Sequence, residues 1–421
     1  MKRVKIMALA VAAALSVARP AAGQMQAQSG GGATGENAFN PGISLILNGV
    51  YGNLSQDPAG FRIDGFVPTL GEVGPPNRGL SLGESELTFS ANIDPHFRGV
   101  GIVALTPENE AEIEEAYVQT LGLSHGLTAK AGRFFSGVGY LNEIHAHAWD
   151  FTDAPLANKV FLGGQLGDDG IQVKWVAPTE LYFDIGVEVG RGRQFPSGSD
   201  RNKNGSGSGN VFTHVGGDIG TSTAWQAGLS YLSTSPLDRS YEDTDSAGTP
   251  QVINSFTGRS RLWVLSGVLK WAQNHNPTYT NFKLQGEYFR RRENGDVTFD
   301  TTAVTAGGTQ TSGHRSTQSG LYLQGVYQFM PQWRVGYRYD RLDAGTTNIS
   351  LVDSGALTAA DFPILAKYNP TRHAVMADWS GSEFSRIRLQ FAQDKSRSGV
   401  TDKQVFLQYI MSLGAHGAHK F

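Results

Sequence analysis

The stretch Ser385–Lys395, with the sequence SRIRLQFAQDK, alternates two kinds of residue along its length. Odd positions from Ile387 to Phe391 are apolar, whereas even positions from Arg386 to Gln390 are charged or polar. Because successive side chains of an extended chain point to opposite faces, this period of two predicts a strand with one apolar and one charged face.

The same alternation recurs along most of the chain, in segments that are bounded by turn-forming residues. Trp333 to Asp340 and Phe183 to Gly190 show it as clearly as the first stretch does. Sixteen such strands are predicted, near residues 42–54, 80–94, 97–106, 112–122, 127–138, 170–177, 181–193, 210–219, 223–234, 260–272, 279–293, 314–329, 332–343, 371–380, 385–395 and 402–414.

The connections between these strands distinguish a membrane barrel from a soluble sheet protein, which can show the same alternation. Tight turns such as 94–96 mostly alternate with long loops such as 139–169 and 344–370, and the short connection at 107–111 is an exception. Outer-membrane barrels have short periplasmic turns and long outer loops, and a sheet in lipid must close. The sequence therefore predicts an all-β fold over residues 40–421, a transmembrane antiparallel β-barrel of about sixteen strands.

The N-terminus has the features of an export signal. Basic side chains within residues 2–5 precede an apolar run at 6–18, which is shorter than the roughly 20 residues of a membrane helix. Small residues at 21–23 suit cleavage, so we expect a signal peptide at 1–23, a flexible segment at 24–39, and a bacterial outer-membrane location.

Composition excludes several other classes of protein. The chain has no cysteine, which rules out disulfides, thiolate metal sites and a cysteine nucleophile. Its formal net charge of -3 gives no basic excess that would indicate nucleic acid. The segment Gly205–Gly209 resembles a serine-hydrolase elbow by composition only and lies in a low-complexity loop. We therefore expect no enzymatic activity.

The C-terminal strand and two short motifs carry a resemblance to a known family. The chain ends on Phe421, which looks like the C-terminal aromatic signature of bacterial outer-membrane proteins. KAGRFF at 130–135 and GAHGAHKF at 414–421 are similar to uncharacterised proteobacterial porin-like proteins related to the phosphate-selective porins. The resemblance implies passive diffusion of small hydrophilic solutes or ions, contact with outer-membrane lipid, and a homotrimer.

Residues 139–169 form the third outer loop of the predicted barrel. In sixteen-stranded porins the loop at this place folds into the lumen, so the resemblance makes it the candidate constriction; the alternative is that it covers the barrel mouth. The predicted pore-lining residues are Glu143, His145, His147, Asp150 and Asp153 on the loop, facing Arg334, Arg338, Arg386 and Arg388 on the wall.

The strand faces that carry charge predict a lumen with two kinds of wall. Early strands contribute acidic residues and later strands contribute mostly basic ones, so opposite walls would differ in sign, and the basic wall would favour anions. The simpler interpretation is that these charges only keep the lumen wet. The acidic set is Glu84, Glu86, Glu115, Asp184 and Glu188, and the basic set is Lys270, Lys283, Arg291, Arg334, Arg338, Arg386 and Arg388.

Two histidine pairs raise the question of a metal. His145 and His147 would share a face of extended chain, and His416 with His419 could form a second pair. Zinc accepts imidazole ligands, and Asp150 or Asp153 could complete a site. Solvated histidines and no cofactor are the simpler expectation. Zinc- or phosphate-linked uptake and an occluded structural barrel therefore stay as alternatives to an open porin.

Overall fold

The computed structural model describes residues 41–69, 73–108, 110–198 and 204–414. The predicted signal peptide, the whole of the predicted N-terminal segment and the pair His416 and His419 lie outside these residues. Among the described residues, no helix is long and apolar enough to cross a membrane.

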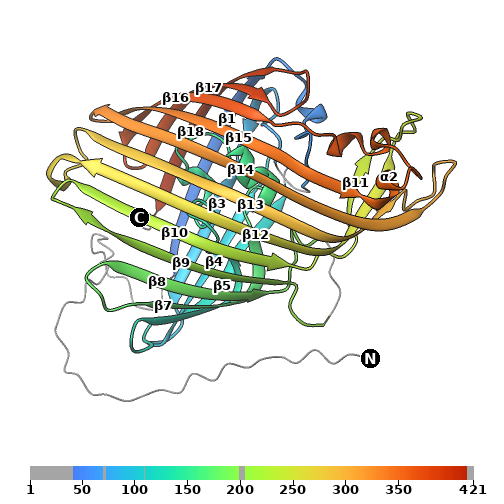
Figure 1. The fold of residues 1–421 in the computed structure, drawn as a ribbon. Coiled ribbons are helices and arrows are strands. Elements are labelled where there is room, and N and C mark those ends of the chain that lie inside the picture. Colours follow the sequence, from blue (N-terminus) through green and yellow to red (C-terminus); the bar gives the residue numbers. More distant parts are fainter. Residues whose placement is uncertain (1–40, 70–72, 109, 199–203, 415–421) are drawn as a thin grey trace. The chain divides into compact units, whose positions relative to one another are not determined.

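Sixteen strands form the wall of a barrel, as the alternation predicts (Figure 1). They are β1 (Gly42–Leu54), β3 (Ser85–Asn92), β4 (Phe97–Leu105), β5 (Ala111–Thr120), β6 (Leu127–Phe135), β7 (Gly167–Val176), β8 (Tyr182–Gly190), β9 (Ser208–Ile219), β10 (Thr223–Thr234), β12 (Val252–Ala272), β13 (Asn281–Phe299), β14 (Gln310–Met330), β15 (Trp333–Ile349), β16 (Thr371–Ser382), β17 (Ser385–Lys395) and β18 (Asp402–Gly414).

Two further strands are accessory. β2 (Gly79–Leu82) pairs with β1 next to β3. One extra residue between β2 and β3 shifts the register of their pairing with β1. β11 (Arg239–Asp243) pairs with the extension of β12. The helices are short: α1 (Leu156–Leu162), α2 (Ser350–Asp353) and 3-10 turns at Pro58–Gly60, Ala146–Ala148, Gln273–His275, Ala359–Asp361 and Pro363–Leu365.

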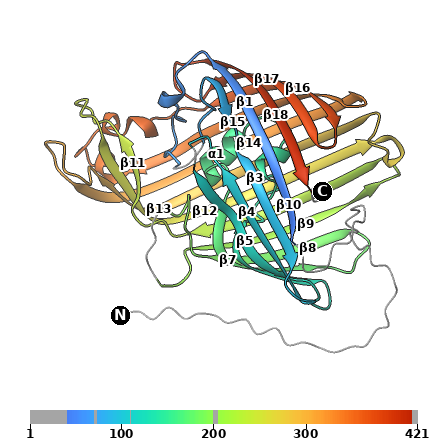
Figure 2. The ribbon, with the colours of Figure 1, turned by 180° about the vertical axis from the view of Figure 1, so that it is seen from behind.

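The sheet closes on itself. Each wall strand pairs antiparallel with the next, and β18 pairs with β1 from Ser44 opposite Gly414 to Leu54 opposite Gln404 (Figure 2). Closure leaves no open edge in the wall. The predicted fold class is thus confirmed, including tight connections at one end of the strands and long ones at the other.

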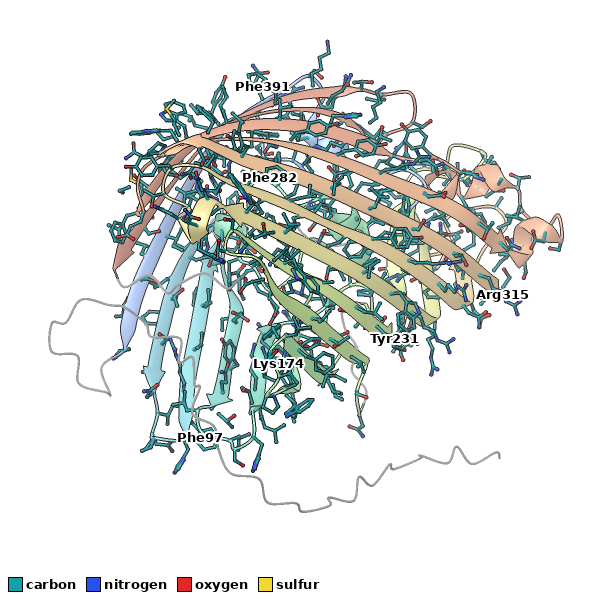
Figure 3. The ribbon with its side chains drawn as sticks, turned by 60° about the vertical axis from the view of Figure 1, so that its left-hand side comes forward. Phe97, Lys174, Tyr231, Phe282, Arg315 and Phe391 are labelled. Atoms are coloured by element: carbon teal, nitrogen blue, oxygen red, sulfur yellow. The ribbon has the colours of Figure 1, made fainter. Side chains whose placement is uncertain are left out.

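Side chains divide between the two faces of the wall as the period of two predicts. On β17, Ile387 and Phe391 are 45% and 49% exposed on the outside, whereas Arg388 and Gln390 are 1% and 0% exposed within. Figure 3 shows side chains of this outer surface, Phe391 among them. A contiguous apolar exterior of this kind needs an apolar environment around it.

Strands β12 to β15 extend further than predicted, so the expected loops at 235–259 and 294–313 are partly strand. Beyond the apolar band the outward positions become polar, while inward positions such as Val297 and Phe299 are buried and pack with Leu351 of α2. The apolar outward positions that mark the predicted strands therefore stop there, which is why the sequence underestimates these strands. Exposed arginines occupy the outward positions at the edge of the apolar band: Arg259, Arg261, Arg290, Arg292 and Arg315.

A β-bulge in β15 depends on one glycine. The pairing of β14 with β15 shifts register between Thr317 and Ser319, opposite Gly345. Gly345 has a φ of +58°, and a Cβ there would lie 2.0 Å from the carbonyl oxygen of Thr317. A residue with a side chain would therefore be strained in its backbone and would also collide with the neighbouring strand.

We predict that Gly345→Ala destabilises the folded barrel by roughly 1–3 kcal/mol, the usual cost of a strained backbone. The unfolding midpoint of the detergent-solubilised protein, followed by circular dichroism, measures this. Gly267→Ala is the matched control, because a Cβ at Gly267 meets no atom within 4 Å. Equal unfolding midpoints for the two variants would contradict the conclusion that the bulge requires glycine at position 345.

Candidate functional site

The third long loop lies inside the barrel. All seven residues of α1 are buried, and the loop's apolar side chains pack on wall residues of β12 to β15 such as Val264 and Leu342. The Phe161 ring stacks on Phe289 of β13, with centroids 5.8 Å apart and planes 11° apart. The loop thus occupies the lumen and is not laid over the mouth.

Asp153 is the most heavily bonded acidic residue of the loop. Its carboxylate accepts hydrogen bonds from Arg338 Nη2 at 3.1 Å, Lys159 Nζ at 3.3 Å and Gln390 Nε2 at 3.2 Å, and also from Arg372. Burial alone would raise the pKa of Asp153, but the neighbouring cations outweigh it and hold the pKa well below its usual range. The carboxylate therefore stays charged and connects the loop to three wall strands.

Asp150 makes a second set of ionic contacts with the same side of the barrel. Its carboxylate accepts from Lys283 Nζ at 3.0 Å and from Arg334 Nη1 at 3.1 Å. Arg334 also donates to Asp378 at 2.6 and 3.0 Å. Burial opposes ionisation of Asp150, yet Lys283 and Arg334 lower its pKa. The loop thus neutralises part of the basic wall.

The wall arginines predicted to line the pore lie largely behind this loop. Arg338 and Arg388 are 1% exposed, and Arg388 Nη2 donates to the carbonyl of Trp149 at 2.9 Å. Arg386 is partly buried, and its Nε and Nη1 have no hydrogen-bond partner. Glu143 is also partly buried. The structure therefore brings loop and arginines together, and the contact covers much of the basic wall.

A bulge in β5 places two consecutive glutamates on the inner face of the acidic wall. Pairing of β4 with β5 shifts register between Ile102, opposite Glu115, and Val103, opposite Ile113, so Glu114 is the extra residue. A bulge re-aims a side chain in this way. The adjacent glutamates of EIEEA at 112–116 are the only sign of it in the sequence, because they interrupt the period of two.

The two loop histidines contact this acidic wall. His145 Nδ1 lies 3.1 Å from Glu86 Oε2 and 3.3 Å from Glu114 Oε2, and its Nε2 lies 3.1 Å from Glu115 Oε2. His147 Nδ1 lies 2.7 Å from Glu86 Oε1. Burial lowers the pKa of His145, but the three glutamates outweigh it and raise the pKa well above its usual value.

The sequence allows Asp150 or Asp153 to complete a site with these histidines, but both carboxylates lie elsewhere. Asp150 and Asp153 bind arginine and lysine side chains, whereas wall glutamates surround the imidazoles. Sequence spacing could not indicate this, because Glu86 and Glu115 come from strands that meet the loop only in the folded barrel.

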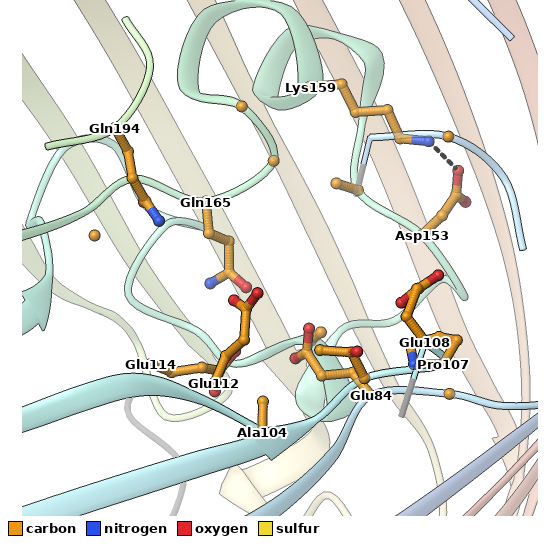
Figure 4. A pocket seen from close by; sticks show the side chains of 18 of the residues that line it. Glu84, Ala104, Pro107, Glu108, Glu112, Glu114, Asp153, Lys159, Gln165 and Gln194 are labelled. Atoms are coloured by element: carbon orange, nitrogen blue, oxygen red, sulfur yellow. Dashed lines mark hydrogen bonds and ion pairs between the residues drawn. The ribbon is translucent and has the colours of Figure 1, made fainter. Parts of the chain in front are cut away.

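A cavity of about 1090 Å³ lies between the loop and the early strands (Figure 4). Its basic side chains are mostly paired: Arg133 contacts Asp169 at 2.7 Å, and Arg239 contacts Glu293 at 2.8 Å. Lys159 is paired with Asp153, and its burial lowers its pKa despite that neighbour. The acidic side chains that line the cavity are Glu84, Glu108, Glu112, Glu114 and Asp153.

Asp153 thus belongs both to the predicted pore-lining set and to this cavity. Glu108, Glu112 and Glu114 were missed by sequence reasoning. The first lies in a connection whose path the alternation does not predict, and the other two adjoin the bulge. The cavity is bordered by the acidic wall and by the loop, with the basic wall on the far side of the loop.

Comparisons with known proteins agree with the fold. No protein-family profile matches the chain. An uncharacterized protein of Aquifex aeolicus is 29% identical over 411 residues, covering 92% of this chain and 81% of that protein.

Solved structures of outer-membrane proteins share the barrel at low sequence identity. The channel DcaP of Acinetobacter baumannii has a TM-score of 0.52 at 12% identity, covering 90% of this chain and 99% of that one. A loop-deletion form of OmpT of Vibrio cholerae has a TM-score of 0.52 at 10% identity, covering 90% and 100%. The chain is thus similar in fold to bacterial outer-membrane proteins.

Proposed function

We propose that the chain is an outer-membrane channel of the porin type, through which small hydrophilic solutes or ions diffuse passively. The observation that supports this most directly is the charged cavity of about 1090 Å³ inside a closed barrel, beside an inward-folded loop. In this proposal the loop is the constriction, and the cavity beside it is the passage.

The exterior supports placement in a bacterial outer membrane. Its apolar side chains face outward around the wall, and outward arginines at the long-loop end mark where the apolar band stops. Export by a cleaved signal peptide and long loops facing the environment complete the proposed topology. A homotrimer is part of the proposal, since OmpT of Vibrio cholerae, with a TM-score of 0.50, has been solved in a trimer form.

The cavity favours cations over anions. Several carboxylates border it, whereas its lysine and two of its arginines are held in ion pairs. The basic wall, which could have attracted phosphate or other anions, contacts loop aspartates instead of the cavity. A negative electrostatic potential in a water-filled passage attracts cations and repels anions. We therefore prefer a cation-selective porin to a phosphate channel.

Conductance of the refolded protein in a planar bilayer tests the channel. We expect stepwise openings, and a reversal potential under a salt gradient whose sign reports cation preference. Replacing both Glu108 and Glu112 by Gln should move the reversal potential toward zero, because two cavity carboxylates lose their charge. Glu242→Gln, on the exposed face of β11, is the control and should leave it unchanged.

The outcomes separate the alternatives. Folded barrels that never conduct would indicate an occluded structural barrel and overturn the porin proposal. A reversal potential of the opposite sign would restore the anion channel that the basic strands suggest. Saturable block by one solute would indicate a specific uptake protein.

Asp153→Asn tests the loop as the constriction. The substitution leaves Arg338, Arg372 and Lys159 without their shared carboxylate, and breaking a buried ion pair from one side costs roughly 3–5 kcal/mol. We expect the loop to detach from the wall, with a larger single-channel conductance and a lower unfolding temperature. Asp353→Asn, at the exposed C-terminal residue of α2, is the control. A lower unfolding temperature with unchanged conductance would show that the loop does not limit the flow.

A further inference from the structure

Three potential metal ligands converge on the inner side of the acidic wall. One carboxylate oxygen each from Glu86 and Glu114 and one imidazole nitrogen from His145 lie within 4.8 Å of one another. They come from β3, β5 and the third loop, so only the folded barrel assembles them. We propose that these three residues bind a divalent transition-metal cation of the Zn²⁺ class.

The contacts within this cluster are ionic and do not include a well-aligned hydrogen bond at His145 Nδ1. His145 Nδ1 and Glu114 Oε2 are both buried and lie 3.3 Å apart, yet neither atom makes a hydrogen bond. Buried polar atoms without partners are rare and costly, and a bound ion can supply the missing interaction. A cation between these atoms would accept a lone pair from each of them.

The spacing of the ligand atoms suits zinc. Zinc binds imidazole nitrogen and carboxylate oxygen at roughly 2.0–2.2 Å in a tetrahedron, which sets ligand atoms roughly 3.3 Å apart. His145 Nδ1 lies 3.1 Å from Glu86 Oε2 and 3.3 Å from Glu114 Oε2. The ligands therefore need little movement around such an ion. A nitrogen ligand also favours zinc over calcium or magnesium, which take oxygen ligands.

Neighbouring residues contact the three ligands and orient them, as metal sites require. Nε2 of His145 lies 3.1 Å from Glu115 Oε2, so a proton on Nε2 would leave Nδ1 free to bind the metal. The second oxygen of Glu86 lies 2.7 Å from His147 Nδ1, which orients that carboxylate. Both contacts come from residues outside the ligand set.

Access to the site is through the cavity. Glu114 lines the cavity of about 1090 Å³, so a hydrated cation and a water or solute as further ligand can reach it. The inference goes beyond the proposed channel, because binding of a metal does not require that the barrel conducts.

Zinc binding by the full mature chain tests the site. After treatment with a chelator, the refolded protein in detergent is titrated with Zn²⁺ by calorimetry, and bound metal is measured by mass spectrometry. We expect one bound zinc that excess Ca²⁺ does not displace. Cobalt in its place should give the intense visible absorption of a tetrahedral site.

Variants assign the ligands. Glu115→Gln removes a residue that orients the His145 ligand, and this should weaken zinc binding by roughly 10–100-fold. His145→Gln and Glu114→Gln remove ligands themselves, so each should weaken zinc binding by more than that. His275→Gln, at an exposed turn, should bind as the unmodified chain does. Circular dichroism of each variant confirms that the barrel has folded.

Two results would overturn the proposal. Absence of stoichiometric zinc from the folded chain would mean that a protonated His145, and no metal, balances the charge of the glutamates. Binding that survives His145→Gln but disappears when His416 and His419 are both replaced would place the metal at the C-terminal pair. Neither result depends on conductance, so failure of the metal site and failure of the channel are distinguishable.

Discussion

Closure of the sheet by the pairing of β18 with β1 is the constraint on which the other features depend. A closed wall sends one face of every strand outward, and within the apolar band charged side chains are excluded from that face. They are therefore collected inside, where many are also shielded from water. Arg291, Arg338, Arg372 and Arg388 are each 1% exposed. Charges buried to this degree require partners.

The third loop supplies many of those partners. Its aspartates and main-chain carbonyls bind arginines of the later strands, and Phe161 anchors it on the apolar part of the same inner surface. Buried ion pairs contribute less to stability than to the choice of one arrangement, because desolvation offsets much of their attraction. The loop is thus directed toward the basic wall, and the open space is left beside the acidic wall.

This asymmetry has a consequence for the histidines. The segment of loop that carries His145 and His147 lies on the side away from the arginines, where wall glutamates are the available partners. One loop therefore neutralises the basic wall with carboxylates and contacts the acidic wall with imidazoles. The bulge at Glu114 increases the negative charge at that contact.

Much of the architecture follows from local pattern. The predicted bounds of the strands from Ser385 to Lys395 and from Asp402 to Gly414 agree with the observed ones, and the outward direction of Ile387 and Phe391 is correct. The prediction is less accurate where the chain leaves the apolar band, as at the extensions of β12 and β14. The outward face of those extensions is polar, and inward residues such as Val252 and Phe256 are buried, so the pattern of the apolar band does not continue there.

The order of neighbouring residues along the chain is enough to predict the barrel, its two faces and the loop that carries the charged residues. Which charges meet is set by the folded barrel, which brings Asp153 to Arg338 and Arg372 and brings His145 to Glu86, Glu114 and Glu115. These partners are far apart along the chain. Their contacts arise from the curvature of the closed sheet and the path of a loop through its interior, which no local periodicity encodes.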